Sequence, residues 1–285
     1  MKIYNVSGYS LIAAHLLASG WAAPSGWGFL GGALVGLAYL IFIWFFGGLY
    51  LSDVMHMGIA HKALDYQPWF IKSVAVFYNV LGIYINPTSW VNRHRHHHAF
   101  SDHDGDPNKL DEDGLWRTMY LCIFPYRCRS NLAKDPIFKS WPFRLTSNRY
   151  FGVFSQVSSF VFLWLLTRDW KYSLVLWVSV RLFALWINLV QNYWTHDRRF
   201  GTRRYQDDRD NAMNLGEWLP VTASFSASLQ NNHHHFPHFL RTSHARDEYD
   251  FGFLTVRVMK AMRLVKATPS GAQKPEGILV DGIGL

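Results

Sequence analysis

Cysteine is scarce in this chain, and charged residues are missing from its longest apolar stretch. Cys122 and Cys128 are the only two thiols among 285 residues, which is too few to hold an iron–sulfur cluster. The stretch from 28 to 51 has no charged side chain over a length greater than the roughly 20 residues that cross a hydrocarbon core. The lack of charge there indicates a membrane protein.

Four apolar runs predict four transmembrane helices in two hairpins. The runs cover residues 6–23, 28–51, 151–167 and 172–194. A Pro-Ser-Gly turn at 24–26 separates the first pair, and a polar turn at 168–171 separates the second. A cleaved signal peptide is the alternative for the first run, but only Lys2 precedes it as a basic residue and a longer apolar run follows. The sequence therefore predicts an all-α integral membrane fold.

An even number of spans places both termini on one side of the membrane, together with residues 52–150 and 195–266. These segments hold most of the lysines and arginines, so the positive-inside rule predicts that they form a cytoplasmic helical cap. The formal charge of +8 would attract anionic lipid headgroups or an acidic electron-transfer partner, whereas nucleic acid is a poor alternative. A plainer alternative is that the basic residues only orient the spans. We expect a single domain, with residues 267–285 as a disordered tail.

The sequence also predicts where two further segments and one residue of the last apolar run lie relative to the membrane. Trp69 to Pro87 is apolar but carries Lys72 and is too short for a span, so we expect a helix at the cytoplasmic interface. Phe251 to Val265 alternates apolar and basic residues at helical spacing, as an interfacial amphipathic helix does. Arg181 would be costly in lipid, so it should face the interior of the helix bundle and pair with a polar group.

Histidine is abundant, and most of the 14 histidines fall in four short segments on the predicted cytoplasmic side. His94, His97 and His98 have the i, i+3, i+4 spacing that brings three rings to one helix face, with the adjacent pair splayed by about 100°. One helix can thus supply rings to two metal ions. His56 and His61 are five residues apart, which is about 140° of rotation on an α-helix. We therefore expect either that the helix ends between them or that each serves a different metal.

Two more segments repeat this logic nearer the C-terminus. His233 and His234 have the same spacing, with Gln230 at its first position. Asn192 and His196 are spaced i, i+4 at the end of the fourth run, so both face one point. All four segments can converge on one site.

The number of histidines narrows the kind of site. Imidazole binds zinc, copper, iron or nickel, so the residue type alone does not select the metal. Eight histidines exceed the four ligands of a structural zinc and suit two ions that keep open positions for O2 or water. Few carboxylates lie within these segments, which disfavours a carboxylate-bridged site of the ferritin-like kind. The alternatives are histidines without a metal and a non-enzymatic membrane protein that binds zinc or iron for structure or sensing.

Four motifs surround these histidines: HMGIAH, PTSWVNRHRHHHAFSDHDGDP, NYWTHDRRFGTRRY and QNNHHHFP. They resemble the membrane fatty acid desaturase family, which includes the stearoyl-CoA desaturases and the acyl-lipid desaturases of bacteria and plastids. The resemblance extends from about Asp53 to Val265. Two departures stand out, because Gln230 occupies the place of a histidine in most members and Ala227-Ser228 replaces the usual Glu-Gly.

The resemblance implies a di-iron centre with eight histidine ligands. These are His56, His61, His94, His97, His98, His196, His233 and His234. It also implies that Asn192 holds a metal-bound water and that Gln230 coordinates directly or through water. Asp104 and Asp106 would fix the orientation of ligating imidazoles.

The implied activity is O2-dependent fatty acyl desaturation at two iron ions that cycle between Fe2+ and Fe3+. The acyl group would arrive on a lipid, on coenzyme A or on an acyl carrier protein. The sequence has no cytochrome b5-type His-Pro-Gly-Gly segment and no ferredoxin-like cysteine set, so we expect a separate ferredoxin or cytochrome b5 with a reductase. The alternative is a related histidine-box hydroxylase, ketolase or acetylenase acting on a lipid-like substrate.

Overall fold

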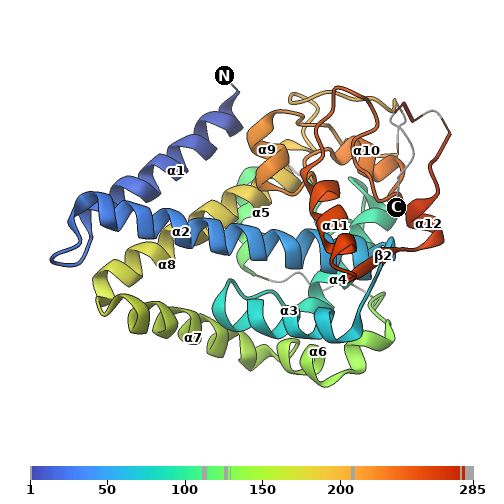
Figure 1. The fold of residues 1–285 in the computed structure, drawn as a ribbon. Coiled ribbons are helices and arrows are strands. Elements are labelled where there is room, and N and C mark those ends of the chain that lie inside the picture. Colours follow the sequence, from blue (N-terminus) through green and yellow to red (C-terminus); the bar gives the residue numbers. More distant parts are fainter. Residues whose placement is uncertain are drawn as a thin grey trace.

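The computed structural model describes residues 2–110, 114–124, 128, 130–206, 209–276 and 278–279. Long helices form a bundle at one end of the molecule, and shorter elements form a cap at the other (Figure 1). The bundle consists of α1 (Ile3–Trp21), α2 (Gly28–Gly48), α7 (Arg149–Thr167) and α8 (Trp170–Leu189). Two of these helices continue into the cap as π-helices, since α2 runs into η1 (Leu49–Ala60) and α8 into η3 (Val190–Trp194).

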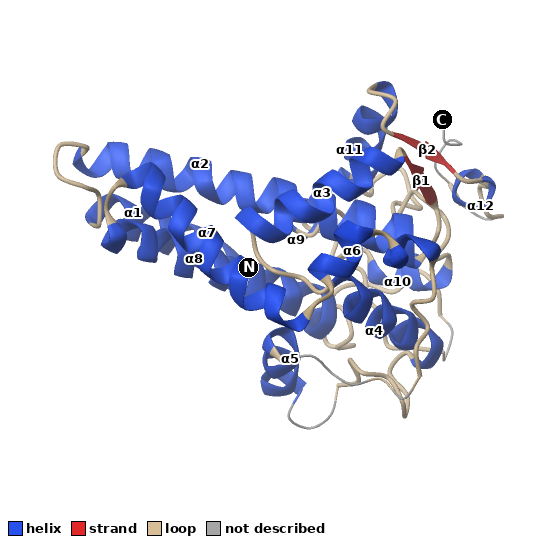
Figure 2. Cartoon of the chain, turned by 90° about the horizontal axis from the view of Figure 1, so that it is seen from below, coloured by secondary structure: helices blue, strands red, loops and turns tan. Residues whose placement is uncertain are grey.

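The cap contains short helices and one small sheet. Its further helical elements are α3 (Pro68–Leu81), α4 (Pro87–Phe100), α5 (Gly114–Ile123), η2 (Pro136–Lys139), α6 (Trp141–Thr146), α9 (Trp218–Ala223), α10 (Gln230–His235), α11 (Phe251–Ala261) and α12 (Pro269–Ala272). Strands β1 (Leu64–Tyr66) and β2 (Val265–Ala267) pair antiparallel at the edge of the cap (Figure 2). The chain is thus mostly helical, with a two-stranded addition that the sequence did not predict.

Three helices in the described part of the chain are long and apolar enough to cross a membrane. They are Gly28–Ala60, Arg149–Thr167 and Trp170–Trp194. The first predicted span, 6–23, also folds as a helix, but α1 carries several polar residues and is not among these three. A membrane protein is therefore supported, whereas four spans in two hairpins remain a prediction.

Polar contacts inside the bundle fasten α1 to its neighbours. The buried ring of His15 donates from Nε2 to the carbonyl oxygen of Gly36 at 2.8 Å and lies 2.6 Å from Ser179 Oγ through Nδ1. Gly36 allows this close approach, because a Cβ atom there would overlap the side chain of Ser19. Helix α1 thus packs against both α2 and α8.

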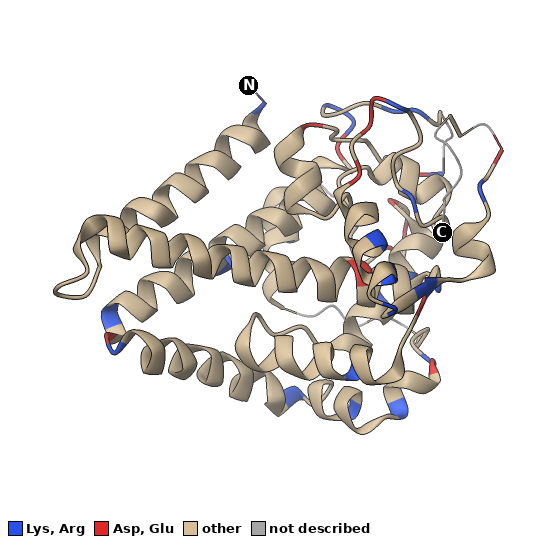
Figure 3. Cartoon of the chain, in the orientation of Figure 1, with Lys and Arg blue, Asp and Glu red and all other residues tan. Residues whose placement is uncertain are grey.

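Arg181 is a cation on a bundle helix whose surface otherwise carries little charge (Figure 3). Its guanidinium donates to Gln156 Oε1 at 2.8 Å and to Ser159 Oγ at 3.1 Å. The same group lies 3.6 Å from the ring centroid of Trp177. The prediction that Arg181 pairs with polar groups inside the bundle is confirmed.

The segment after Lys266 is ordered over most of its described length. We expected disorder over 267–285, but β2 and α12 continue the chain there and pack on the cap. Leu240 donates its backbone N–H to Gly271 O at 3.2 Å, and Leu279 donates to His244 O at 3.0 Å. Residues 277 and 280–285 lie outside the described part. The contacts that order this segment come from distant residues, which the local composition does not reveal.

Candidate metal centre

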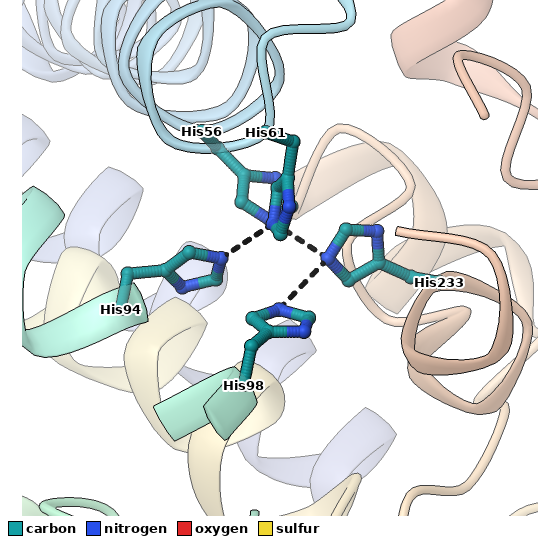
Figure 4. Close-up of side chains that lie close together, drawn as sticks. All are labelled: His56, His61, His94, His98 and His233. Carbon is teal, nitrogen blue, oxygen red and sulfur yellow. Dashed lines mark hydrogen bonds between the residues drawn. The ribbon is translucent and has the colours of Figure 1, made fainter. Parts of the chain in front are cut away.

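The eight histidines expected as ligands lie together at the junction of bundle and cap. Five ring nitrogens, one each from His56, His61, His94, His98 and His233, lie within 4.8 Å of one another (Figure 4). We call this group cluster A. Three more, from His97, His196 and His234, satisfy the same limit and form cluster B.

The π-helix η1 brings His56 and His61 into the same cluster. Its hydrogen bonds connect residues five apart, as between His61 N and His56 O at 3.0 Å. Residues five apart therefore stack on one face, and the two ring centroids are 4.8 Å apart. The expectation from α-helical rotation, that the two rings should not share a site while the helix continues, is wrong here.

Helix α4 supplies both clusters from one face, as its spacing predicted. It begins at Pro87, and the Asn86 side chain caps it by accepting from Ser89 N at 3.0 Å. His94 and His98 enter cluster A, whereas His97 enters cluster B.

Helix α10 divides its rings in the same way. His233 belongs to cluster A and His234 to cluster B. The neighbouring histidines outside the expected set have other contacts: His96 lies 2.9 Å from Ser130 O, and His235 stacks on Tyr205 with centroids 3.9 Å apart.

The nitrogens of cluster A have the spacing of ligands around one ion. The Nε2 atom of His233 lies 2.9 Å from that of His56 and 3.2 Å from that of His98, and the Nε2 atoms of His61 and His94 are 2.7 Å apart. Ligands at right angles on an ion with bonds of about 2.1 Å would be about 3.0 Å apart. Burial, and then the charge of neighbouring imidazoles, lowers the pKa of His61, His94 and His98 well below the ordinary value. Neutral rings of this kind offer lone pairs to a metal.

Cluster B has a different surrounding, because a carboxylate stands behind each ring. The Nδ1 atom of His97 lies 2.9 Å from Asp106, that of His196 lies 3.0 Å from Asp102, and that of His234 lies 3.2 Å from Asp210. The three Nε2 atoms are buried and have no hydrogen-bond partner among the described residues. A carboxylate on Nδ1 fixes the tautomer that leaves Nε2 free for a metal.

The charge of cluster B follows from these pairs. Burial alone would lower the pKa of His196, but the nearby Asp102 carboxylate raises it above the ordinary value. In return, the imidazole holds the pKa of Asp102 below its usual range against the effect of burial. Three carboxylates thus offset positive charge at cluster B, whereas no carboxylate is within hydrogen-bond distance of a cluster A ring in the described residues.

The sequence did not predict two of the three carboxylates behind the rings of cluster B, and one carboxylate that it did predict lies elsewhere. Asp106 has the predicted place beside a cluster histidine, but the Asp104 side chain is exposed and pairs with Lys109 at 2.7 Å. Asp102 and Asp210 stand at the other two rings. The Ser-Asp pair within the second motif was a signal for Asp102, whereas Asp210 lies in a loop without a recognised motif.

The two predicted amide residues lie near the clusters. Asn192 accepts from Asn108 Nδ2 at 3.0 Å, donates to Asn188 O at 3.0 Å, and borders the same cavity as His94. The Oε1 atom of Gln230 is buried and has no hydrogen-bond partner among the described residues. A buried oxygen without a hydrogen-bond partner in the protein indicates a place where an ion or a water molecule can bind.

A cavity of about 320 Å³ leads from the clusters into the bundle. Trp90 and His94 border it near cluster A, whereas Leu40 and Val180 border it in the bundle. The helical rise between Asn192 and Val180 corresponds to about 18 Å. One lipid tail spans about half of a 30 Å hydrocarbon core, so the cavity is long enough for much of such a tail.

Comparison with known proteins agrees with this arrangement. The family model described as fatty acid desaturase matches residues 33–252. The chain is 28% identical over 242 residues to an sn-1 stearoyl-lipid 9-desaturase of Anabaena variabilis, covering 81% of this chain and 82% of the relative. It is 27% identical over 290 residues to an sn-2 palmitoyl-lipid 9-desaturase of Nostoc sp. (strain 36), covering 95% and 93%. A Delta-9 acyl-lipid desaturase 1 of Arabidopsis thaliana is 25% identical over 250 residues, covering 84% and 77%. The chain, an oxidoreductase by this kinship, belongs to the fatty acid desaturase family.

Proposed function

We propose that this enzyme introduces a double bond into the acyl chain of a membrane lipid, at two iron ions held by clusters A and B, with O2 as co-substrate. The observation that carries the proposal is the pair of adjacent histidine clusters at the end of an apolar cavity. His98 of cluster A and His234 of cluster B have ring centroids only 4.5 Å apart, so two ions would be neighbours.

The proposed ligands are the eight histidines of the two clusters, with Asn192 acting through water and Gln230 through its unpartnered oxygen. Iron in this setting supplies an oxidant strong enough for an unactivated methylene group, which no side-chain acid or base can attack. The protein binds and orients the substrate. Trp90 stacks on His94 with centroids 4.9 Å apart and gives the cavity a flat, rigid wall beside cluster A. The apolar walls hold the chain and exclude water.

The substrate class follows from the relatives, whose names specify acyl lipids and position 9. A lipid tail also suits an apolar cavity that continues into a bundle of membrane-type helices. We propose that α1 is a fourth span, because its polar residues form hydrogen bonds within the bundle. We also propose that both termini and the metal centre lie on the cytoplasmic side. Electrons would come from a separate ferredoxin or cytochrome b5 with a reductase, docking on basic residues of the cap.

The test is expression in a host that lacks the double bond, with iron content and double-bond position measured together. We expect two irons per chain and a new unsaturated acid. His97→Ala should lose both product and iron, whereas His96→Ala, which changes the adjacent ring outside the clusters, should retain both. A hydroxylated or triple-bonded product would agree with the proposed metal centre and would show that the enzyme catalyses a different reaction there. Zinc without any product despite a supplied reductant would refute the proposal.

A further inference from the structure

Helix α5 has one buried face and one exposed apolar face. Its buried residues include Thr118 and Leu121, and the helix packs on α8 and η3. The opposite face exposes large side chains at i, i+4, i+7 and i+8: Trp116 (71% exposed), Tyr120 (58%), Ile123 (66%) and Phe124 (51%). Residues with this spacing lie along one side of a helix. We call them the outer face of α5.

The position of α5 favours a bilayer over water as the surrounding of its outer face. The helix lies where the bundle meets the cap (Figure 2). It packs on α8, which itself exposes Leu174, Val178 and Leu182 along one side. Aromatic residues such as Trp and Tyr are enriched where the hydrocarbon core meets the headgroups. The outer face therefore has both the place and the composition of an interfacial element.

Charge next to the outer face fits lipid headgroups. A polar pocket of about 530 Å³ is bordered by Trp116, Tyr193, Arg198 and Arg199. Both arginines are exposed, although Arg199 also pairs with Asp197. Cationic side chains beside an aromatic, apolar surface are what an interface with phosphate-bearing lipids requires.

The outer face also borders the opening of the cavity. Ile123 is the only exposed residue among the described residues that line the cavity. At the other end, Leu40 and Val180 are buried, so that end is closed. Leu121 and Cys122 complete the α5 side of the wall. The cavity therefore opens beside the C-terminal end of α5.

We propose that the outer face of α5 lies in the headgroup–acyl boundary of the bilayer and that the tail of a membrane lipid enters the cavity sideways past Ile123. The entry route rests on the proposed function, because it specifies how the lipid substrate reaches that site. It makes α5 one side of a lateral opening and removes the need for the tail to cross the aqueous face of the cap.

The bilayer contact is tested with a nitroxide attached to an unnatural ketone residue, so that both native cysteines remain. Labels replace Tyr120, Val157 on α7, or Asp104, whose side chain is 99% exposed in the cap. The protein is placed in vesicles of phosphatidylcholine and phosphatidylglycerol. For the labels at 120 and 157, we expect O2 to broaden the spectrum more than a water-soluble nickel chelate does. For the label at 104, we expect the nickel chelate to broaden the spectrum more than O2 does. A label at 120 that behaves like the one at 104 would overturn the bilayer contact.

The entry route is tested with a photoreactive residue at 123, and at 104 as control, in the same vesicles. Illumination should attach lipid acyl chains at 123 and none at 104, as identified by mass spectrometry. An active enzyme without lipid adducts at 123 would overturn the route and leave the proposed function intact. A bilayer-embedded α5 in a protein that forms no double bond would instead overturn the proposed function and leave the contact standing.

Discussion

Asp102→Asn should weaken metal binding at cluster B and leave cluster A intact. In the native protein, Oδ2 of Asp102 accepts from Asn211 N at 2.8 Å and lies 3.0 Å from His196 Nδ1, whereas Oδ1 lies 3.2 Å from the same ring nitrogen. An asparagine that keeps its oxygen on the Asn211 N–H group would place its amide NH2 at the Oδ1 position, beside His196 Nδ1, and would lose the negative charge that favours a proton on that nitrogen. His196 would then accept on Nδ1 and carry its proton on Nε2, the atom that faces the metal position.

We expect one of the two metal ions per chain to bind with lowered affinity. Removal of a partner behind a ligating histidine typically costs about 10–100-fold in metal affinity, or about 1.4–2.8 kcal/mol. The assay is titration of metal-free protein with Co2+, followed by absorption spectroscopy and by metal analysis after desalting. Asp104→Asn is the matched control, because that carboxylate is exposed and pairs only with Lys109 among the described residues. Two equivalents bound with native affinity by Asp102→Asn would refute the tautomer argument.

The remaining predictions concern the cavity, the bundle and pH. Ala184→Phe should fill the cavity that Ala184 lines, so unsaturated product falls while the iron content stays native; Leu182→Phe, on the exposed side of α8, should change neither. His15→Ala removes the buried ring that bonds both Gly36 O and Ser179 Oγ, at a cost of about 1–3 kcal/mol, and a melting temperature in detergent equal to that of the native protein would contradict this. Burial lowers the pKa of His244 to about 3, so the ring takes up a proton on unfolding and stability falls as the pH drops from about 6.5 towards 3. His244→Phe should flatten that part of a denaturation-against-pH curve, and an unchanged slope would assign the acid sensitivity to other groups.

The grouping of the histidines on α4 and α10 was predictable because spacing and helix geometry act over a few residues. His94, His97 and His98 divide between the clusters as a regular α-helix requires. The convergence of His56 and His61 was not predictable, because a π-helix is rare and nothing in LYLSDVMHMGIA marks one. Asp210 was also hidden, since it is 24 residues from its partner His234 in the chain and only the folded loop brings them together.

The short strands and the ordered C-terminal segment escaped prediction for a related reason. Strand β2 is three residues long and pairs with β1 about 200 residues away, so its stability depends on tertiary contacts and not on propensity. The side chain of Ile278 is buried against Phe239 in the same way. The apolar runs, by contrast, predicted the bundle helices well, because α2, α7 and α8 are each apolar over their own length.

The continuous rod made by α2 and η1 couples the register of a bundle helix to the position of two histidines of cluster A. These 33 residues run without a break from the far turn of the bundle to the last residue before His61. Adding or removing one residue in α2 would rotate everything beyond it by about 100° and shift it by about 1.5 Å relative to the lipid-facing side. His56 and His61 would then leave cluster A even though neither had been changed. Length variation in this protein is therefore expected in its turns and loops and not in this rod.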